Sequence, residues 1–372
     1  MTTIELRELF ADDTKYLNKQ VSLLGWIRNH RKQKTFGFID FFDGTCYRAL
    51  QVVYDDRLAD FEQIKTLHVG ASVNVSGTLV VSGGKTQGVE LALSEVTLIG
   101  DCPEEYPLQP KRHSLEFLRE IAYLRPRSRL FQAVFRLRST ASFAIHKYFN
   151  DRGYVYVHTP LITGNDAEGA GNTFTVTALD ELNIGTDFGE DFFGKHTSLA
   201  VTGQLEAETF AMAFKNVYTF GPTFRAENSN TKTHVAEFWM IEPEIAFCDL
   251  QQLMDIEEDF LKYIVKYIME NAADELVFLE MFSKSKLKDK LQALIDSDIA
   301  RITYREAIDI LSNADAKFDH TPYFGGDLAK EHEKYLTDTH FASPVFVYDW
   351  PKDIKAFYMH QNEDDTVGAV DL

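Results

Sequence analysis

A change in hydrophobic periodicity near residue 128 constrains the fold more than any other feature of this sequence. Before it, residues 19–101 read as short strand-like runs broken by Gly and Asp: VSLLGWIRN, FGFIDFFDG, YRALQVVYD, ASVNVSGTLVVS and VELALSEVTLIG. After it, apolar residues from Leu130 to Phe149 recur at helical spacing. Because the two patterns need separate cores, the 372 residues are expected to form at least two domains.

The first region, residues 1–101, predicts a five-stranded OB-type β-barrel with one helical stretch near Arg57 to Leu67. That fold presents one face to single-stranded nucleic acid. A formal net charge of −19 repels nucleic acid at long range, so such a role needs a local basic surface. Residues 26–34, WIRNHRKQK, supply one, although a solvated hairpin loop would look the same.

Residues 102–127 contain four prolines and are expected to be a linker, followed by a second domain over 128–372. We expect a long helix over 128–150, a strand YVYVHTPLIT that runs into Pro160, and an antiparallel pair from KNVYTFGPTFRAEN and HVAEFWMIEPEIAF. A helical region follows at about 250–300, and PVFVYDW, IKAFYMH and VGAVDL read as strands. The fold class is therefore α+β, an antiparallel sheet flanked by helices.

Several classes of protein are disfavoured by composition. No apolar run reaches the roughly 18 residues of a membrane span, and the opening lacks the apolar core of a signal peptide. We therefore expect a cytoplasmic protein without a membrane partner. Three widely spaced cysteines favour neither a disulfide framework nor a zinc site. GGKT at 83–86 ends like a phosphate-binding loop but sits between strands, which favours a hairpin turn.

The sequence GPTFRAENSNTKTHVAEFWMIEPE contains the strongest chemical signal. Arg225 could form two parallel bonds to a phosphate, and Glu227, two residues further on the same strand face, could orient a base or a metal ion. The alternative for an isolated arginine and glutamate is a surface salt bridge. Three histidines, His332, His340 and His360, lack metal-ligand spacing.

These strings also carry a resemblance. FRAENSNT followed by HVAEFWMIEPE closely resembles motif 2 of asparaginyl-tRNA synthetases, and DFFGKHTSLAVTGQLEAETFAMAFKNVYTF resembles the segment before it. In that family residues 128–150 and the strand ending at Pro160 look like motif 1, the class II dimerisation element. The resemblance implies an OB-fold anticodon-binding domain, a class II catalytic domain and a homodimer.

The resemblance also implies site residues. For ATP, Arg225 would contact the α-phosphate, Glu227 the adenylate-binding region, and Phe238 would stack on adenine while His234 lies near the triphosphate. For the amino acid, the implied residues are Glu168, which would hold the α-ammonium group, and Gln204 in the same pocket. Glu168 could instead be a solvated loop acid.

Discrimination between asparagine and aspartate is expected near residue 207. Aspartyl relatives have a lysine three residues after the glutamine, whereas this chain has Ala207. With Glu206, Glu208 and Glu242 in the same segments, the pocket suits an amide NH2 and disfavours a second carboxylate. We expect Glu242 to read the amide.

In the barrel, the resemblance places Phe38 and Gln51 on the central anticodon uridine, one by stacking and one by hydrogen bonding. Phe38 could instead belong to the barrel core. Arg28 and Arg31 would contact phosphates.

The expected activity is ATP- and Mg²⁺-dependent activation of L-asparagine and its transfer to tRNA(Asn), without a covalent nucleophile. Asp371 matches the first of two metal-linked acids in the family, but motif 3 and the second acid would lie beyond Leu372. We therefore expect a C-terminally truncated chain, which leaves a non-catalytic tRNA-binding or dimerising remnant as an alternative. An aspartyl enzyme and an asparagine synthetase are disfavoured by Ala207 and by the barrel, respectively.

Overall fold

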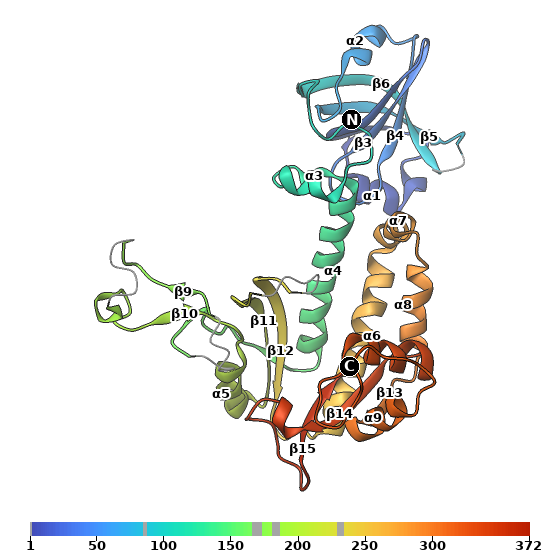
Figure 1. Ribbon diagram of the computed structural model, residues 1–372. Helices are drawn as coiled ribbons and strands as arrows, with labels where there is room; N and C mark the ends of the chain where they lie inside the picture. Colours follow the sequence, from blue (N-terminus) through green and yellow to red (C-terminus); the bar gives the residue numbers. More distant parts are fainter. Residues whose placement is uncertain (1, 85–87, 166–172, 181–186, 229–233) are drawn as a thin grey trace. The chain divides into compact units, whose positions relative to one another are not determined.

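The computed structural model describes residues 2–84, 88–165, 173–180, 187–228 and 234–372 (Figure 1). The chain forms two compact units, each described here by itself. One comprises residues 1–139 and 272–287, and the other comprises residues 140–271 and 288–372. The first unit thus combines the N-terminal residues with a short segment from much later in the chain.

The first unit is built on a closed barrel of five strands, as the sequence predicted. The strands are β2 (Gln20–Lys32), β3 (Phe36–Phe42), β4 (Leu50–Asp55), β5 (Ser72–Val81) and β6 (Val89–Gly100). Their order is β2-β3-β4-β6-β5, and β2 also pairs with β5, which closes the barrel. The short strand β1 (Thr2–Thr3) adds to β2 in parallel.

Alternation along the strands separates the barrel core from its outer face. In β3, Ile39 and Phe41 are fully buried while Phe38 and Asp40 are only partly covered on the opposite face. Gly37 is required by close packing, because a Cβ there would lie 2.2 Å from the phenol ring of Tyr54. The side-chain period of two therefore fixes which residues can meet a ligand outside the barrel.

Among the described residues, four α-helices belong to the first unit, together with the start of a fifth. They are α1 (Leu6–Ala11), α2 (Phe61–Thr66), α3 (Leu115–Glu120) and α7 (Ala273–Ser283). The predicted helical stretch near Arg57 to Leu67 is confirmed by α2. Helix α3 begins at Ser114, whose hydroxyl accepts a bond from the Phe117 amide at 3.2 Å, as an N-cap does. Helix α7 ends at Lys284 in the left-handed conformation.

Helix α4 (Arg129–Asp151) confirms the long helix predicted over 128–150, and the boundary between the two units falls within it. The other helices of the second unit are α5 (Gln204–Phe214), α6 (Leu250–Asn271), α8 (Leu287–Asp296), α9 (Tyr304–Ser312) and α10 (Lys330–Lys334). Its strands are β7 (Val155–Tyr156), β8 (Ile162–Thr163), β9 (Thr175–Val176), β10 (Thr197–Leu199), β11 (Asn216–Phe224), β12 (Glu237–Ile245), β13 (Ala300–Thr303), β14 (Val345–Pro351) and β15 (Thr366–Asp371).

The predicted antiparallel pair is the centre of the second unit. Strands β11 and β12 pair along nine residues each, from Asn216 opposite Ile245 to Phe224 opposite Glu237. The C-terminal half of α4 packs on this pair, with Phe149 stacked on Tyr218 at 4.4 Å between ring centroids. Helix α5 packs on it through Ala207, which is fully buried against Val217. Both elements appear beside β11 and β12 in Figure 1.

Two segments that the sequence predicted as strands are mostly irregular in the structure. YVYVHTPLIT forms only the two-residue strands β7 and β8, since Pro160 between them has no amide hydrogen to donate. IKAFYMH was wrong as a strand: it begins in a 3₁₀ turn, and Phe357 is 86% exposed. No helix among the described residues combines the length and apolarity needed to cross a membrane.

Candidate functional site

One face of the β11–β12 pair gathers most of the residues singled out in the sequence. Because Thr219 lies opposite Glu242 and Thr223 opposite Phe238, every second residue of β12 projects from the same face. The amide of Arg225 donates to the carbonyl of Ala236 at 3.0 Å, which continues the ladder past the end of β11. The face therefore carries, in order, Arg225, Phe238, Met240, Glu242 and Glu244.

Arg225 and Phe238 lie close together at one end of this face. The guanidinium carbon of Arg225 is 5.5 Å from the centroid of the Phe238 ring, and one of its nitrogens donates to the Val201 carbonyl at 3.5 Å. Both side chains are partly exposed. A cation next to an aromatic face suits a phosphate attached to a flat base.

Glu242 lies in the middle of the face and is held by three donors. Its carboxylate accepts from the hydroxyl of Thr202, from that of Thr219 at 2.7 Å, and from the Gly203 amide at 3.2 Å and 3.1 Å. These bonds engage both oxygens. Glu242 therefore fixes the turn at Thr202 and Gly203 from which helix α5 begins.

Gln204 is the first residue of α5, so the turn at Thr202 and Gly203 sets the position of its side chain. Its amide nitrogen donates to Glu208 at 3.1 Å, one helical turn on. Ala207 faces inward in the same helix and is 0% exposed. A lysine at this position has no room without displacing Val157 or Val217, its neighbours in the core.

Glu244 was missed by the sequence reasoning, although it follows Glu242 at the spacing that keeps a strand residue on one face. Burial, followed by the charges of Glu208 and Glu242, raises its pKa to about 7. The site thus contains a carboxyl group that titrates near neutral pH. The two glutamates of the EPE sequence, spaced by two residues, could have indicated that Glu244 lies beside Glu242.

The other site residues predicted for this unit lie either away from the β11–β12 face or outside the residues that the structure describes. Glu168 falls in residues 166–172, outside the described residues. Glu227 and His234 are exposed, on either side of residues 229–233, which are also outside. Their roles stay predictions.

Asp371, near the end of β15, bonds the ammonium group of Lys355 at 2.7 Å. Burial, and then the charge of Asp371, raise the pKa of Glu257 on α6 to about 7. Within the described residues no group of three or more His, Cys, Asp or Glu could enclose a metal ion. A pair of carboxylates is compatible with Mg²⁺, since that ion keeps several waters and takes other ligands from phosphates.

A cavity of about 340 Å³ adjoins the same sheet. Thr202, Gly203 and Glu242 line it together with Tyr156 and Trp239. Its size suits an amino acid or part of a nucleotide.

In the first unit, Arg31, Phe38 and Gln51 meet on the outer face of the barrel. Arg31 lies opposite Phe38 in the β2–β3 ladder, with its guanidinium carbon 5.0 Å from the ring centroid, and donates to the Gln51 side-chain oxygen at 3.0 Å. Gln51 in turn donates to Glu90 at 2.9 Å. Phe38 is not part of the barrel core, which removes the alternative considered for it.

Arg28 does not join this group. The β2–β3 register shifts between Ile27 and Asn29, so Arg28 is the extra residue of a bulge. Its guanidinium lies over the Phe42 ring at 4.0 Å and donates to Gln132 at 2.7 Å. It lines a different cavity of the same unit.

Comparison with known protein families identifies the class of protein to which this chain belongs. A family of class II tRNA synthetases, described for D, K and N, matches residues 114–372, and an OB-fold nucleic acid binding domain matches residues 21–99. Together they confirm the predicted fold, an OB-fold barrel followed by a class II synthetase domain of mixed α+β structure.

Individual relatives narrow the class further. The chain is 53% identical to the asparagine–tRNA ligase of Acholeplasma laidlawii, over 99% of this chain and 81% of that protein. It is 51% identical to that of Clostridium botulinum (strain Alaska E43 / Type E3), over 100% and 81%. The asparaginyl-tRNA synthetase of Pyrococcus horikoshii complexed with asparaginyl-adenylate superposes with a TM-score of 0.80 at 28% identity, covering 96% of this chain and 77% of that one. The chain belongs to the asparagine–tRNA ligase family of class II synthetases.

Proposed function

We propose that this chain activates L-asparagine with ATP and transfers it to tRNA(Asn), on the face of β11 and β12. The observation that carries the proposal is the alignment of Arg225, Phe238 and Glu242 on one sheet face, with Glu242 bonded to the turn from which helix α5 and Gln204 begin, in a family whose relatives are about half identical. Each of these residues has the chemistry that its expected role needs.

The nucleotide would lie at the Arg225 end. Arg225 would bind the α-phosphate and Phe238 would stack on adenine, a pairing that their 5.5 Å separation supports. Glu227 and His234, exposed nearby in sequence, would contact the adenylate region and the triphosphate.

The amino acid would lie at the α5 end. Glu168 would hold its ammonium group and Gln204 would line the same pocket. Glu242 would stand beside the side-chain amide, and because its oxygens already accept three donors, its main effect is to hold the Thr202–Gly203 turn in place. Ala207 offers no cation for a side-chain carboxylate, which favours asparagine over aspartate.

The reaction has two steps. A carboxylate oxygen of asparagine attacks the α-phosphorus in line, and the bond to pyrophosphate breaks as the new O–P bond forms. A hydroxyl of the terminal tRNA ribose then attacks the acyl carbon, loses its proton, and AMP leaves. Arg225 stabilises the charge that develops on the α-phosphate, and the sheet face aligns the reactants. No protein nucleophile takes part.

Asp371 and Glu257 would hold Mg²⁺ through its contact with the ATP phosphates. When bound, Mg²⁺ neutralises phosphate charge. A bound cation would also reverse the upward shift in the pKa of Glu257, since it favours the ionised carboxylate.

On the barrel, Phe38 would stack on an anticodon base, Gln51 would hydrogen-bond its edge, and Arg31 would contact a phosphate. The half-exposed ring of Phe38 and its neighbour Arg31 support this assignment. Arg28 would reach a phosphate only from its own cavity, around the bulge.

We also propose a homodimer in the cytoplasm, formed through α4 and the segment ending at Pro160. Large apolar side chains on these segments are exposed, including Phe135 at 40%, Phe143 at 61% and Tyr156 at 40%. Exposed apolar patches of this kind are typical of interfaces between subunits.

Pyrophosphate exchange tests the proposal on this chain. We expect asparagine to drive ATP–pyrophosphate exchange, aspartate to do so about 100-fold less well, and Arg225→Gln to abolish the reaction. Glu237→Gln, an exposed position at the start of β12, is the matched control and should exchange normally. Preference for aspartate would instead make the chain an aspartyl enzyme. Loss of exchange with both amino acids, with tRNA binding retained, would leave a non-catalytic tRNA-binding protein.

A further inference from the structure

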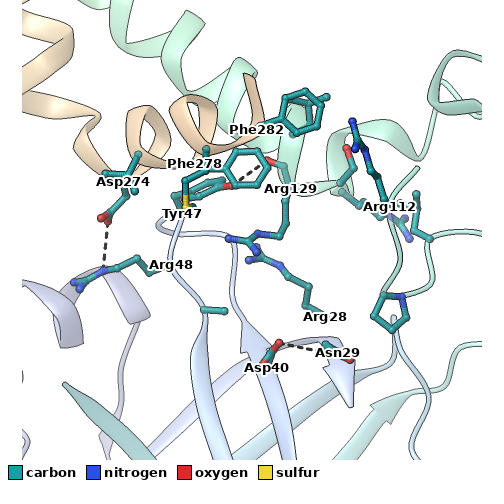
Figure 2. A pocket seen from close by; sticks show the side chains of 18 of the residues that line it. Arg28, Asn29, Asp40, Tyr47, Arg48, Arg112, Arg129, Asp274, Phe278 and Phe282 are labelled. Atoms are coloured by element: carbon teal, nitrogen blue, oxygen red, sulfur yellow. Dashed lines mark hydrogen bonds and ion pairs between the residues drawn. The ribbon is translucent and has the colours of Figure 1, made fainter. Parts of the chain in front are cut away.

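A large cavity in the first unit takes no part in the proposed activation of the amino acid. It encloses about 970 Å³ and is lined by barrel strands, the segment 108–113, the start of α4 and helix α7 (Figure 2). Its volume is at the upper end of the range for small-molecule sites. Every lining residue belongs to the same unit.

The lining is cationic although the chain as a whole is acidic. Seven Lys or Arg side chains line the cavity against three Asp, while the chain carries a formal net charge of −19. Two of the aspartates contact other residues of the lining: Asp274 pairs with Arg48 at 3.4 Å and so neutralises one of the seven cations, and Asp40 accepts from Asn29 at 3.3 Å. A concave surface with this balance attracts anions.

Arg28 and Arg129 form the centre of the positive charge. Figure 2 shows both guanidinium groups projecting into the cavity toward one another. Burial, and then the charge of Arg129, lower the pKa of Arg28 to about 10. No ion pair between either arginine and a carboxylate occurs in the part of the chain that the structure describes. Arg28 is partly buried and Arg129 is exposed, and two like charges that face each other are stabilised when an anion lies between them.

Aromatic rings surround these cations. The guanidinium of Arg129 lies 4.9 Å from the ring centroid of Phe278 and 6.0 Å from that of Tyr47, and Arg112 lies 5.8 Å from that of Phe282. Phe278 and Phe282 come from α7, and Phe282 keeps 38% of its surface exposed. Flat apolar rings next to arginines suit a ligand that combines a heteroaromatic base with a phosphate.

We propose that this cavity is a second nucleotide site, in which Arg28 and Arg129 bind a phosphate and the aromatic side chains of α7 and Tyr47 contact the base. The bulge at Arg28 has a clear function here, because it separates Arg28 from the Arg31 face and directs it into the cavity. The nucleotide can be a free molecule or a residue of an RNA chain. Both share the chemistry that the cavity recognises.

The first arm of the test measures binding of GMP to the whole chain by calorimetry, with the β11–β12 face filled by a non-hydrolysable asparaginyl-adenylate analogue. We expect binding near one GMP per chain, weakened at least about tenfold in Arg28→Gln and Arg129→Gln. Guanosine and inorganic phosphate, used separately, should each bind more weakly than GMP. Arg57→Gln, an exposed arginine of the same barrel that pairs with Asp55, is the matched control.

The second arm measures tRNA binding across a range of salt concentrations. If GMP does not bind but both variants weaken tRNA binding and lower its salt dependence by about one counterion each, an RNA phosphate occupies the cavity. If neither GMP nor tRNA binding changes in the variants, the proposal is overturned. Thermal melting without ligand distinguishes a binding role of Arg28 from a structural one. If Arg28 binds a ligand, Arg28→Gln relieves the repulsion from Arg129 and should be at least as stable as the parent chain. If Arg28 makes a structural contact, Arg28→Gln should be less stable.

Discussion

At the scale of single residues, Glu244 gives the sharpest test of the site's electrostatics. Its pKa is raised to about 7 by burial and by Glu208 and Glu242. Between the ordinary glutamate pKa and 7, the unfolded chain releases a proton that the folded chain keeps. Stability therefore falls as pH rises through this window, and the full penalty applies above pH 7.

Glu244→Gln should remove that penalty. We expect the variant to gain about 1 kcal/mol over the parent chain at pH 8 and almost nothing at pH 4.5, measured by denaturant unfolding at both values. Glu237→Gln is the control, since it removes an exposed carboxylate from the same strand. An equal gain at both pH values would mean that titration of Glu244 does not cause it.

The residues of the site were predictable where strand alternation operates. Phe238 and Glu242 share a face of β12 because their spacing follows a period of two, but their roles came from the family resemblance, and Arg225 joins them only through the register of β11 against β12. The donors that hold Glu242 could not be predicted, since Thr202 and Gly203 lie 40 and 39 residues earlier in the sequence. Arg28 illustrates the same limit: one bulge residue changes the direction of a side chain, and nothing in the basic run 26–34 marks it.

At the scale of elements, the turn before α5 is tightly packed against its neighbours. A Cβ on Gly203 would lie 2.5 Å from the Thr159 hydroxyl and 3.2 Å from a Glu242 oxygen. Gly203→Ala must therefore displace Thr159, Glu242 or the start of α5. We expect it to lower the rate of asparagine-dependent exchange by about 10- to 100-fold, because a shift of about 1 Å in a positioning element has that effect.

The control for this change is Gly88→Ala. A Cβ on Gly88 meets nothing within 4 Å, so the same chemical change there is not expected to alter exchange. Exchange in Gly203→Ala at the parental rate, with unchanged asparagine KM, would show that the turn does not position the substrate.

Helix α4 makes a second prediction at this scale. Phe143 is 61% exposed on α4, although the C-terminal half of this helix buries Ile145, Tyr148 and Phe149. If α4 forms a dimer interface, Phe143→Asp should shift the mass in light scattering from two chains toward one at micromolar concentration. Asn150→Asp, also on α4 and exposed, controls for the added charge. A mass of one chain for the parent protein would refute the proposed interface.

Elements with strong periodicity were the ones that the sequence predicted correctly, namely α4, β11, β12 and the five barrel strands. IKAFYMH failed because its alternation finds no partner strand in the described chain, so its backbone is satisfied in turns instead. The helical region 250–300 was predicted as one feature, yet α7 belongs to the first unit while α6 lies in the second. Periodicity reports which face of a helix is buried but not which core buries it.

At the scale of the whole molecule, the two units carry separable parts of the proposed reaction. In the proposed reaction, activation of the amino acid involves only residues of the second unit, whereas transfer also needs tRNA, whose anticodon would bind at Phe38. Phe38→Ala should therefore leave asparagine-dependent ATP–pyrophosphate exchange unchanged in the absence of tRNA. It should raise the KM for tRNA(Asn) in aminoacylation by about 5- to 100-fold, the range expected when one base loses its stacking partner. Phe36→Ala, which removes the exposed ring beside Phe38, is the matched control and should have a smaller effect. If Phe38→Ala slowed exchange and transfer equally, the barrel would affect the chemistry itself, and the assignment of anticodon binding to this face would be wrong.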